Sequence, residues 1–195
     1  MQQIPQSPHR APGRRYQRLR TWEILGGLWI LAAGFLLHSA YEWSGHWRPI
    51  AAFVPVNESV WEHLKLVFWP GVVFALLESR FLAQEATSFT TAKGLSLCCM
   101  PLVIIAGFYA YTHILGDNSL ALDILIFMLS ILVGQRLSYS LLVRPREARA
   151  WRLPSRAGLA FLLIAFPLFT FYPPHLTLFE HAGTGLYGIL GQPAR

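Results

Sequence analysis

The sequence contains few charged residues and only two cysteines. Of its 195 residues, 13% are charged and 54% are hydrophobic, a composition that excludes an ordinary soluble domain. The adjacent Cys98 and Cys99 would point in different directions on a helix, so the sequence offers neither a disulfide framework nor a cysteine-based metal site. The motif HExxH, the spacing His-x-x-x-His and the nucleophile elbow GxSxG are also absent, so no hydrolase class is identified by such a motif.

Long apolar runs are present instead. About 20 mostly apolar residues are needed to cross a hydrocarbon core of roughly 30 Å, and five segments meet this need: residues 22–40, 60–82, 95–115, 120–142 and 158–173. Backbone groups in lipid have no water to bond, so all five should be helical. The sequence therefore predicts an all-α membrane protein built as a bundle of five transmembrane helices.

Lysine and arginine concentrate on one side of these spans. Thirteen of the 16 basic residues lie there: Arg10, Arg14, Arg15, Arg18, Arg20, Arg80, Lys93, Arg136, Arg144, Arg146, Arg149, Arg152 and Arg156. This positive-inside pattern predicts a cytoplasmic N-terminus and an extracytoplasmic C-terminus. The net charge of +6 then reflects topology and contact with anionic membrane lipid, and we expect no nucleic-acid partner.

The two ends of the chain differ in character. Residues 1–20 contain Pro5, Pro8 and Pro12 among Gln, Ser and Arg, and we expect a disordered basic cytoplasmic tail. Residues 21–175 would form the transmembrane domain. The apolar residues 176–195 would form an extracytoplasmic tail that packs on the outer face, where it could cover a cavity together with the outer loop 42–57.

Ionisable residues gather at the outer ends of the predicted helices. Six of the seven histidines lie there: His38, His46, His63, His113, His175 and His181. Six acidic residues accompany them: Glu42, Glu58, Glu62, Asp117, Asp123 and Glu180. Ionisable side chains entering a membrane are costly and usually face a protein interior or a wet cavity. We therefore expect a polar site at the outer leaflet.

Two sequence patterns within this group indicate metal-binding or catalytic side chains. His38 and Glu42 are four residues apart, so on a continuing helix they would share a face and could bind one metal ion. In the run 57–65, a capping box of Ser59 and Glu62 explains part of the polarity. Capping does not account for Glu58, His63 and Lys65 together.

Two further residues are candidates on different grounds. Asp123 lies among apolar residues one turn inside the fourth span, where a carboxylate needs a cation, a metal or a proton; His113 across the short turn is its expected partner. His175 follows Pro173 and Pro174, which end the fifth span and would present the imidazole rigidly.

The leading hypothesis is a membrane-embedded metal-binding protein, with hydrolysis of a lipid-linked or envelope substrate as its candidate activity. Imidazole and carboxylate ligands without thiolate suit Zn²⁺, Mn²⁺ or Fe²⁺. In this interpretation Glu58 or Glu62 is the general base and Lys65 stabilises developing negative charge. The metal ligands would be His38, His63 and His175 with Glu42 or Asp123.

Three alternatives stay open. A proton-coupled transporter would use Asp123 and Glu62 as carriers, and five spans without an internal repeat would then require a homodimer. A scaffold or accessory subunit would use the polar residues to pair helices. Two of the histidines could instead ligate haem.

Four segments of the sequence together carry a resemblance to a known family: residues 38–45 (HSAYEWSG), 55–65 (PVNESVWEHLK), 122–127 (LDILIF) and 171–176 (FYPPHL). They resemble an uncharacterised family of small bacterial integral membrane proteins, known only as a domain of unknown function. The resemblance extends from the first span to Gly188. It implies a polytopic membrane protein and supplies no activity. We expect the protein to lie in the bacterial inner (cytoplasmic) membrane.

Overall fold

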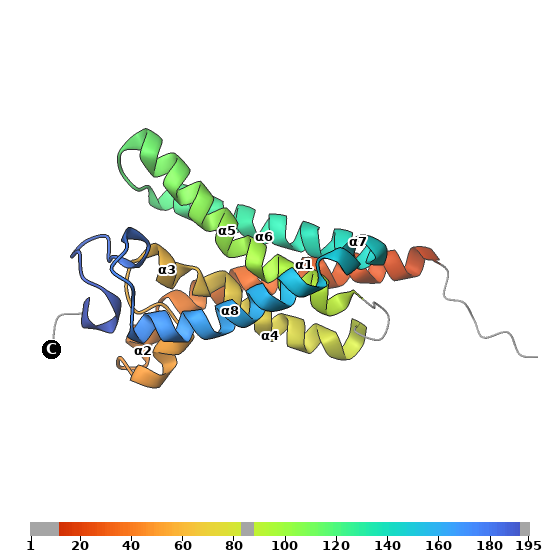
Figure 1. The fold of residues 1–195 in the computed structure, drawn as a ribbon, viewed down its shortest axis with the longest axis horizontal. Helices are drawn as coiled ribbons and strands as arrows, with labels where there is room; N and C mark the ends of the chain where they lie inside the picture. Colours follow the sequence, from red (N-terminus) through yellow and green to blue (C-terminus); the bar gives the residue numbers. More distant parts are fainter. Residues whose placement is uncertain (1–11, 83–87, 192–195) are drawn as a thin grey trace, which may run out of the picture.

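The computed structural model describes residues 12–82 and 88–191, and these are almost entirely helical (Figure 1). Five long apolar helical segments run through the bundle: α1 (Pro12–His38), α3–α4 (Val60–His63 and Lys65–Leu82), α5 (Phe89–Leu115), α6 (Leu120–Val143) and α8 (Arg152–Phe171). Each is long and apolar enough to cross a membrane, which confirms the predicted all-helical fold with five candidate spans. Among the described residues the β-structure is limited to one isolated bridge, between Glu180 and Tyr187.

Several helices begin earlier than predicted. Helix α1 starts at Pro12 and so includes residues 12–20, which were predicted to lie in the N-terminal tail; residues 1–11 lie outside the described chain. Helix α5 begins at Phe89 instead of residue 95, and α8 at Arg152 instead of residue 158. Hydropathy marks the part of a helix that suits hydrocarbon, and these helices continue through polar residues beyond it.

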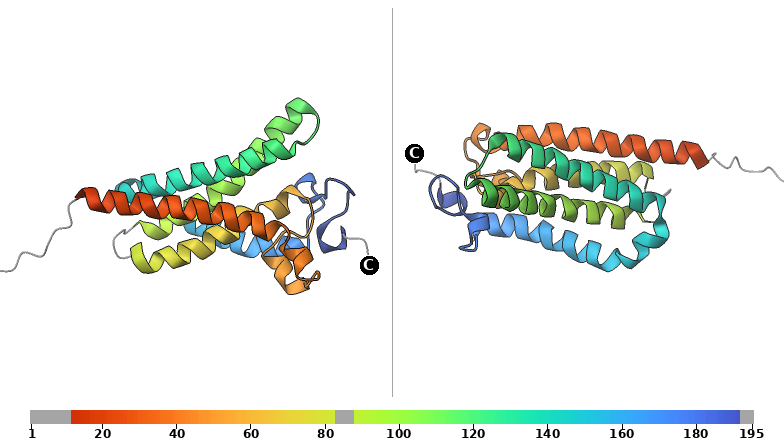
Figure 2. Two further views of the ribbon diagram at one scale, coloured as in Figure 1. Left: turned by 180° about the vertical axis from the view of Figure 1, so that it is seen from behind. Right: turned by 90° about the horizontal axis from the view of Figure 1, so that it is seen from above.

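We call the end of the bundle that carries His38, Gly116 and Phe171 the outer end, and the end that carries Leu82 and Phe89 the inner end. At the inner end the short helix α7 (Pro145–Ala150) joins α6 to α8. At the outer end α5 and α6 form an antiparallel hairpin closed by Gly116, whose φ of 76° suits a residue without a Cβ atom. The tip of this hairpin leans away from the rest of the bundle (Figures 1 and 2).

Short elements cover the outer end on the other side of the bundle: α2 (Ala40–Trp43), η1 (Arg48–Ala52), η2 (Thr177–Phe179) and η3 (Gly188–Gly191). The C-terminal segment folds back onto the loop before α3, where the amide of Asn57 donates to the carbonyl oxygen of Gly188 at 3.1 Å. Ile189 packs there against buried Tyr41, Val54 and Val56. The loop and the C-terminal segment therefore support each other at the level where α1 ends.

A close helix contact positions the outer end of α1. A Cβ atom at Gly34 would lie 2.6 Å from Cζ of Phe127 on α6 and 2.8 Å from the carbonyl oxygen of Leu66 on α4. The backbone oxygen cannot rotate aside, so a side chain here would push α1 away from α4. Because Gly34 is one turn before His38, such a shift would move His38 as well.

We expect Gly34→Ala to lower the free energy of unfolding by about 1–3 kcal/mol, as overpacking commonly does. Gly27→Ala on the same helix is the matched control, because its Cβ atom would meet neighbours only at 3.6 and 3.7 Å, which is ordinary contact. Thermal unfolding in detergent measures both variants. Equal stability of the two would contradict the close approach of α1 and α4.

Candidate metal site

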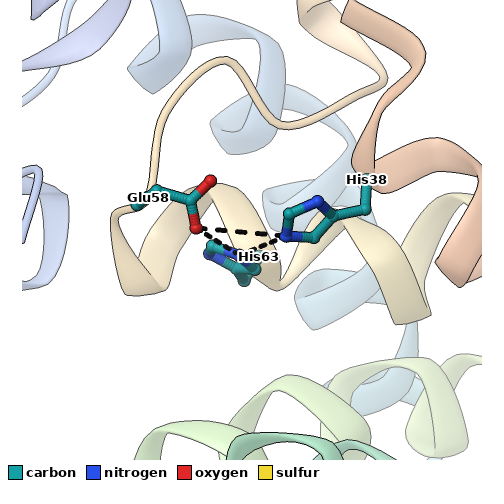
Figure 3. A group of neighbouring side chains, drawn as sticks. All are labelled: His38, Glu58 and His63. Carbon is teal, nitrogen blue, oxygen red and sulfur yellow. Dashed lines mark hydrogen bonds and ion pairs between the residues drawn. The ribbon is translucent and has the colours of Figure 1, made fainter. Parts of the chain in front are cut away.

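Three predicted residues converge at the outer end of the bundle: His38, Glu58 and His63 (Figure 3). The Nε2 atoms of His38 and His63 are 3.2 Å apart. Oε2 of Glu58 lies 3.2 Å from Nε2 of His63 and 3.9 Å from Nε2 of His38. One ligand atom from each residue thus lies within 4.8 Å of the others, and the group could hold a metal ion.

Local structure fixes His63 more firmly than its partners. Ser59 caps α3 by accepting a hydrogen bond from the backbone amide of Glu62 at 3.3 Å, and Asn57 accepts one from the amide of Ser59. His63 ends α3, and its Nδ1 lies 2.9 Å from the carbonyl oxygen of Ser59. A carbonyl oxygen can only accept, so Nδ1 carries a proton and Nε2 is the atom that faces His38 and Glu58.

Electrostatics keep the third member ionised. A hydrogen bond from His63 lowers the pKa of the Glu58 carboxyl group; partial burial opposes this shift, and the nearby His38 adds to it. Glu58 is also the most exposed of the three, with 57% of its side chain accessible, against 46% for His38 and 29% for His63. An anionic carboxylate therefore faces two imidazoles, and a divalent cation would replace the proton that Nε2 of His63 donates to Glu58.

The distances suit a tetrahedral ion. Zinc–nitrogen bonds of about 2.0–2.1 Å imply ligand atoms about 3.3 Å apart around a tetrahedron. The two separations that involve His63 are both 3.2 Å. The third, 3.9 Å, joins the two most exposed side chains, which can rotate by the small amount required. Two histidines and one glutamate leave a fourth position open, as in catalytic zinc sites.

This group borders a cleft of about 970 Å³ between α1, the α5–α6 hairpin and the C-terminal segment. Its walls are mainly apolar and include Phe35, Leu66, Ile104, Phe108, Ile126 and Phe127. Polar residues collect elsewhere along the lining: His38, Glu58, His63, Asn118, Asp123, Glu180 and His181. The leaning hairpin therefore opens an apolar space that reaches the three converging residues.

The structure does not bring the other predicted ligands into the group. Asp123 lines the cleft, and it accepts a hydrogen bond of 2.5 Å from the Tyr111 hydroxyl instead of pairing with His113 as expected. Glu42 is exposed on α2, because α1 ends at His38 and the helix face that would join Glu42 to His38 is broken. His175 stacks on Tyr187 in the C-terminal segment, with ring centroids 4.6 Å apart.

Glu62 and Lys65 belong to a separate buried network, although they were predicted as catalytic residues. Lys65 is fully buried, and its Nζ donates to Oε2 of Glu62 at 2.6 Å and to the hydroxyl of Thr170. It also donates to the carbonyl oxygens of Ala51 and Val54 at 2.8 and 3.2 Å. Neither side chain lines the cleft. Their geometry favours a structural role over the predicted catalytic roles of Glu62 and Lys65.

Sequence reasoning missed a second buried polar group near the inner end. Nζ of Lys93 lies 2.8 Å from Oε1 of Glu23 and 2.6 Å from Oε2 of Glu78. The third predicted span began at residue 95, so Lys93 fell outside it, and Glu23 at the start of the first span was not among the candidate residues. Glu78 and Lys93 are each four residues from the helix ends at Leu82 and Phe89, so counting helix turns from the inner end would have placed these two at one depth.

Comparison with known proteins gives a family without an activity. The family of unknown function DUF6512 matches residues 13–189. No curated protein and no solved structure matches the chain. The match covers the five candidate spans and the three converging residues, so the chain belongs to the family of unknown function DUF6512.

Proposed function

We propose that this protein is a metal-dependent hydrolase embedded in the bacterial cytoplasmic membrane and acting on a lipid or lipid-linked substrate. One observation carries the proposal: two imidazole nitrogens and a carboxylate oxygen, from His38, His63 and Glu58, meet at the rim of a largely apolar cleft. The distribution of basic residues supports a cytoplasmic N-terminus, which would place this cleft in the outer leaflet.

The shape of the cleft supports a substrate with a hydrocarbon chain. Phe35, Leu66 and Phe127 line the space between α1, α4 and α6, at a depth where the surrounding helices are apolar. An acyl or isoprenoid chain lying in the cleft would stay out of contact with water and would pack against these side chains. The hydrolysable bond of the substrate, next to its hydrocarbon chain, would then lie beside His38 and His63.

The residues divide the chemistry between them. His38, His63 and Glu58 would hold the ion, and Ser59 keeps the His63 ring oriented through Nδ1. A divalent ion at this place would polarise a carbonyl or phosphoryl oxygen and activate water. Asp123 lines the same cleft, and we assign it as the general base, with the Tyr111 hydroxyl holding its carboxylate in place.

Metal binding by the detergent-purified protein tests the proposal. We expect one equivalent of zinc or another divalent transition metal in the wild-type protein, measured by elemental analysis and by calorimetric titration after chelation. His63→Ala should weaken binding by at least about 100-fold, since ligands matter at least as much as the residues that orient them.

His113→Ala is the matched control, because His113 is exposed near the outer end of α5 and outside the converging group. It should bind metal as the wild type does. Less than a tenth of an equivalent of metal in the wild type, or equal affinity in His63→Ala, would overturn the proposed site.

A further inference from the structure

A second group of ionisable side chains is buried in the inner half of the bundle, separate from the cleft. It contains Glu23 on α1, Glu78 on α4 and Lys93 on α5, which are 5%, 0% and 7% exposed. Glu23 lies 15 residues before His38, about 22 Å along the helix at 1.5 Å per residue. The group therefore sits deep in the predicted membrane, and the metal site makes no use of it.

Apolar layers close this group off on both sides. An apolar layer lies towards the inner end, about one helical turn from the polar residue on each helix: Leu19, Leu82, Phe89, Leu141 and Leu142. Towards the outer end, Ile30, Val67, Met100 and Ile131 form a second apolar cluster. The polar group is thus enclosed, and the space beside Glu78 and Lys93 is about 10 Å³, room for about one water molecule.

The charges of this group do not balance when all its members are ionised. Two carboxylates face one ammonium group, and the neighbouring Ser138 and Gln135 on α6 are uncharged. Other basic residues near this level, Arg20, Arg80 and Arg136, are exposed, and the half-buried Arg18 donates to the carbonyl oxygen of Phe81. A net negative charge at this depth would be costly.

Hydrogen bonding distinguishes the two carboxyl groups. Oε1 of Glu23 receives hydrogen bonds from Lys93 at 2.8 Å and from Ser138 at 2.7 Å, and such donors stabilise an ionised carboxylate. Glu78 forms an ion pair with Lys93 at 2.6 Å, but neither of its oxygens has a hydrogen-bond partner among the described residues. Oε2 of Glu23 also lacks one.

We propose that Glu23, Glu78 and Lys93 form an enclosed binding site for one proton, which Glu78 carries at neutral pH. The proton comes from water and converts the Glu78 carboxylate into a carboxylic acid, so the group becomes neutral overall. A monovalent cation could balance the charge too, but the small space does not hold a further ligand shell.

This proposal fixes the sign of a pH effect. The folded protein would hold a proton on Glu78 that the unfolded chain releases at neutral pH, so raising the pH favours unfolding. Loss of the proton would leave an uncompensated buried charge between α1, α4 and α5. Stability should therefore fall as the pH rises from the range in which an unfolded glutamate titrates through neutrality, until Glu78 also loses its proton in the folded protein.

Infrared spectroscopy of the detergent-purified full chain tests the proposal. We expect a carbonyl band of a protonated carboxylic acid at neutral pH, equal to one group per chain, that is lost in Glu78→Gln and kept in the control Glu147→Gln, whose side chain is exposed on α7. Glu78→Gln is neutral in both the folded and the unfolded state, so its melting temperature at neutral pH should be at least that of the wild type and should not fall as the pH rises.

The wild-type spectrum decides the matter even if a variant fails to fold. Absence of a carboxylic acid band at neutral pH overturns the proposal. So does a wild-type melting temperature that rises with sodium or potassium concentration, because a bound cation would then balance the charge in place of the proton.

Discussion

Lys65→Met is expected to lower the free energy of unfolding by about 3–5 kcal/mol, the usual consequence of removing one partner of a buried ion pair. The substitution would leave the carboxylate of Glu62, which is 2% exposed, without its cation. It would also remove the donor that serves Thr170 and the carbonyl oxygens of Ala51 and Val54. Thermal unfolding in detergent, followed by tryptophan fluorescence, measures the change.

Two further variants separate this effect from the loss of a long side chain. Glu62→Gln combined with Lys65→Met removes both charges, and we expect it to recover part of the lost stability, since residues in one network couple strongly. Arg80→Met removes an exposed cation near the inner end of the same helix and should change stability by less than about 0.5 kcal/mol. A Lys65→Met protein within about 1 kcal/mol of the wild type would contradict a structural role for the ammonium group.

The network of Glu62 and Lys65 also supports the proposed metal site indirectly, by fixing the backbone that carries His63. Glu62 accepts a hydrogen bond from the backbone of Val56 at 3.0 Å and another from Thr170 of α8 at 2.9 Å. These contacts fix α3 between the preceding loop and α8, and α3 carries His63 at its end. The buried pair therefore holds the backbone that presents the imidazole, while the more exposed Glu58 remains free to meet it.

The fold was largely predictable because membrane helices obey a local rule. Every backbone group in hydrocarbon must bond within its own helix, so apolar length alone identified all five candidate spans. Helix ends follow other rules. Pro12 begins α1 well before the apolar run, and Ser39 interrupts the helix before Glu42. Proline suits a helix start, but the break at Ser39 depends on how the chain packs beyond it.

The site was predictable in part, because helix ends at one level bring some of their polar residues together. His38, Glu58 and His63 were expected at the outer level and do converge. The partners of Lys65 could not be predicted, since Thr170 lies 105 residues away in the sequence. The hydrogen bond that Asp123 accepts from the Tyr111 hydroxyl could not be predicted either, because it depends on the geometry of the α5–α6 turn. Pairings of this kind depend on distances between helices, which periodicity does not give.

Hydrolysis of long-chain substrates should depend on the converging residues. We expect His63→Ala and Glu58→Gln to lower kcat by about 10²–10⁴-fold, because an ion that supplies several kcal/mol of transition-state stabilisation would be lost or misplaced. Fluorogenic esters, amides and phosphodiesters with short and long hydrocarbon chains, presented in detergent micelles, provide the measurement. Long-chain members should be preferred, because the apolar walls formed by Phe35 and Phe127 would bind the chain.

The pattern of results separates this function from its competitors. His113→Ala should retain wild-type rates, since that side chain lies outside the converging group. Bound metal without turnover of any substrate in the series would contradict hydrolysis while leaving the metal site intact, and it would favour a scaffold. Solute flux in proteoliposomes that Asp123→Asn abolishes would favour a transporter. Such flux would have to cross the apolar layer of Ile30, Val67, Met100 and Ile131, and that barrier is the structural reason for expecting hydrolysis instead.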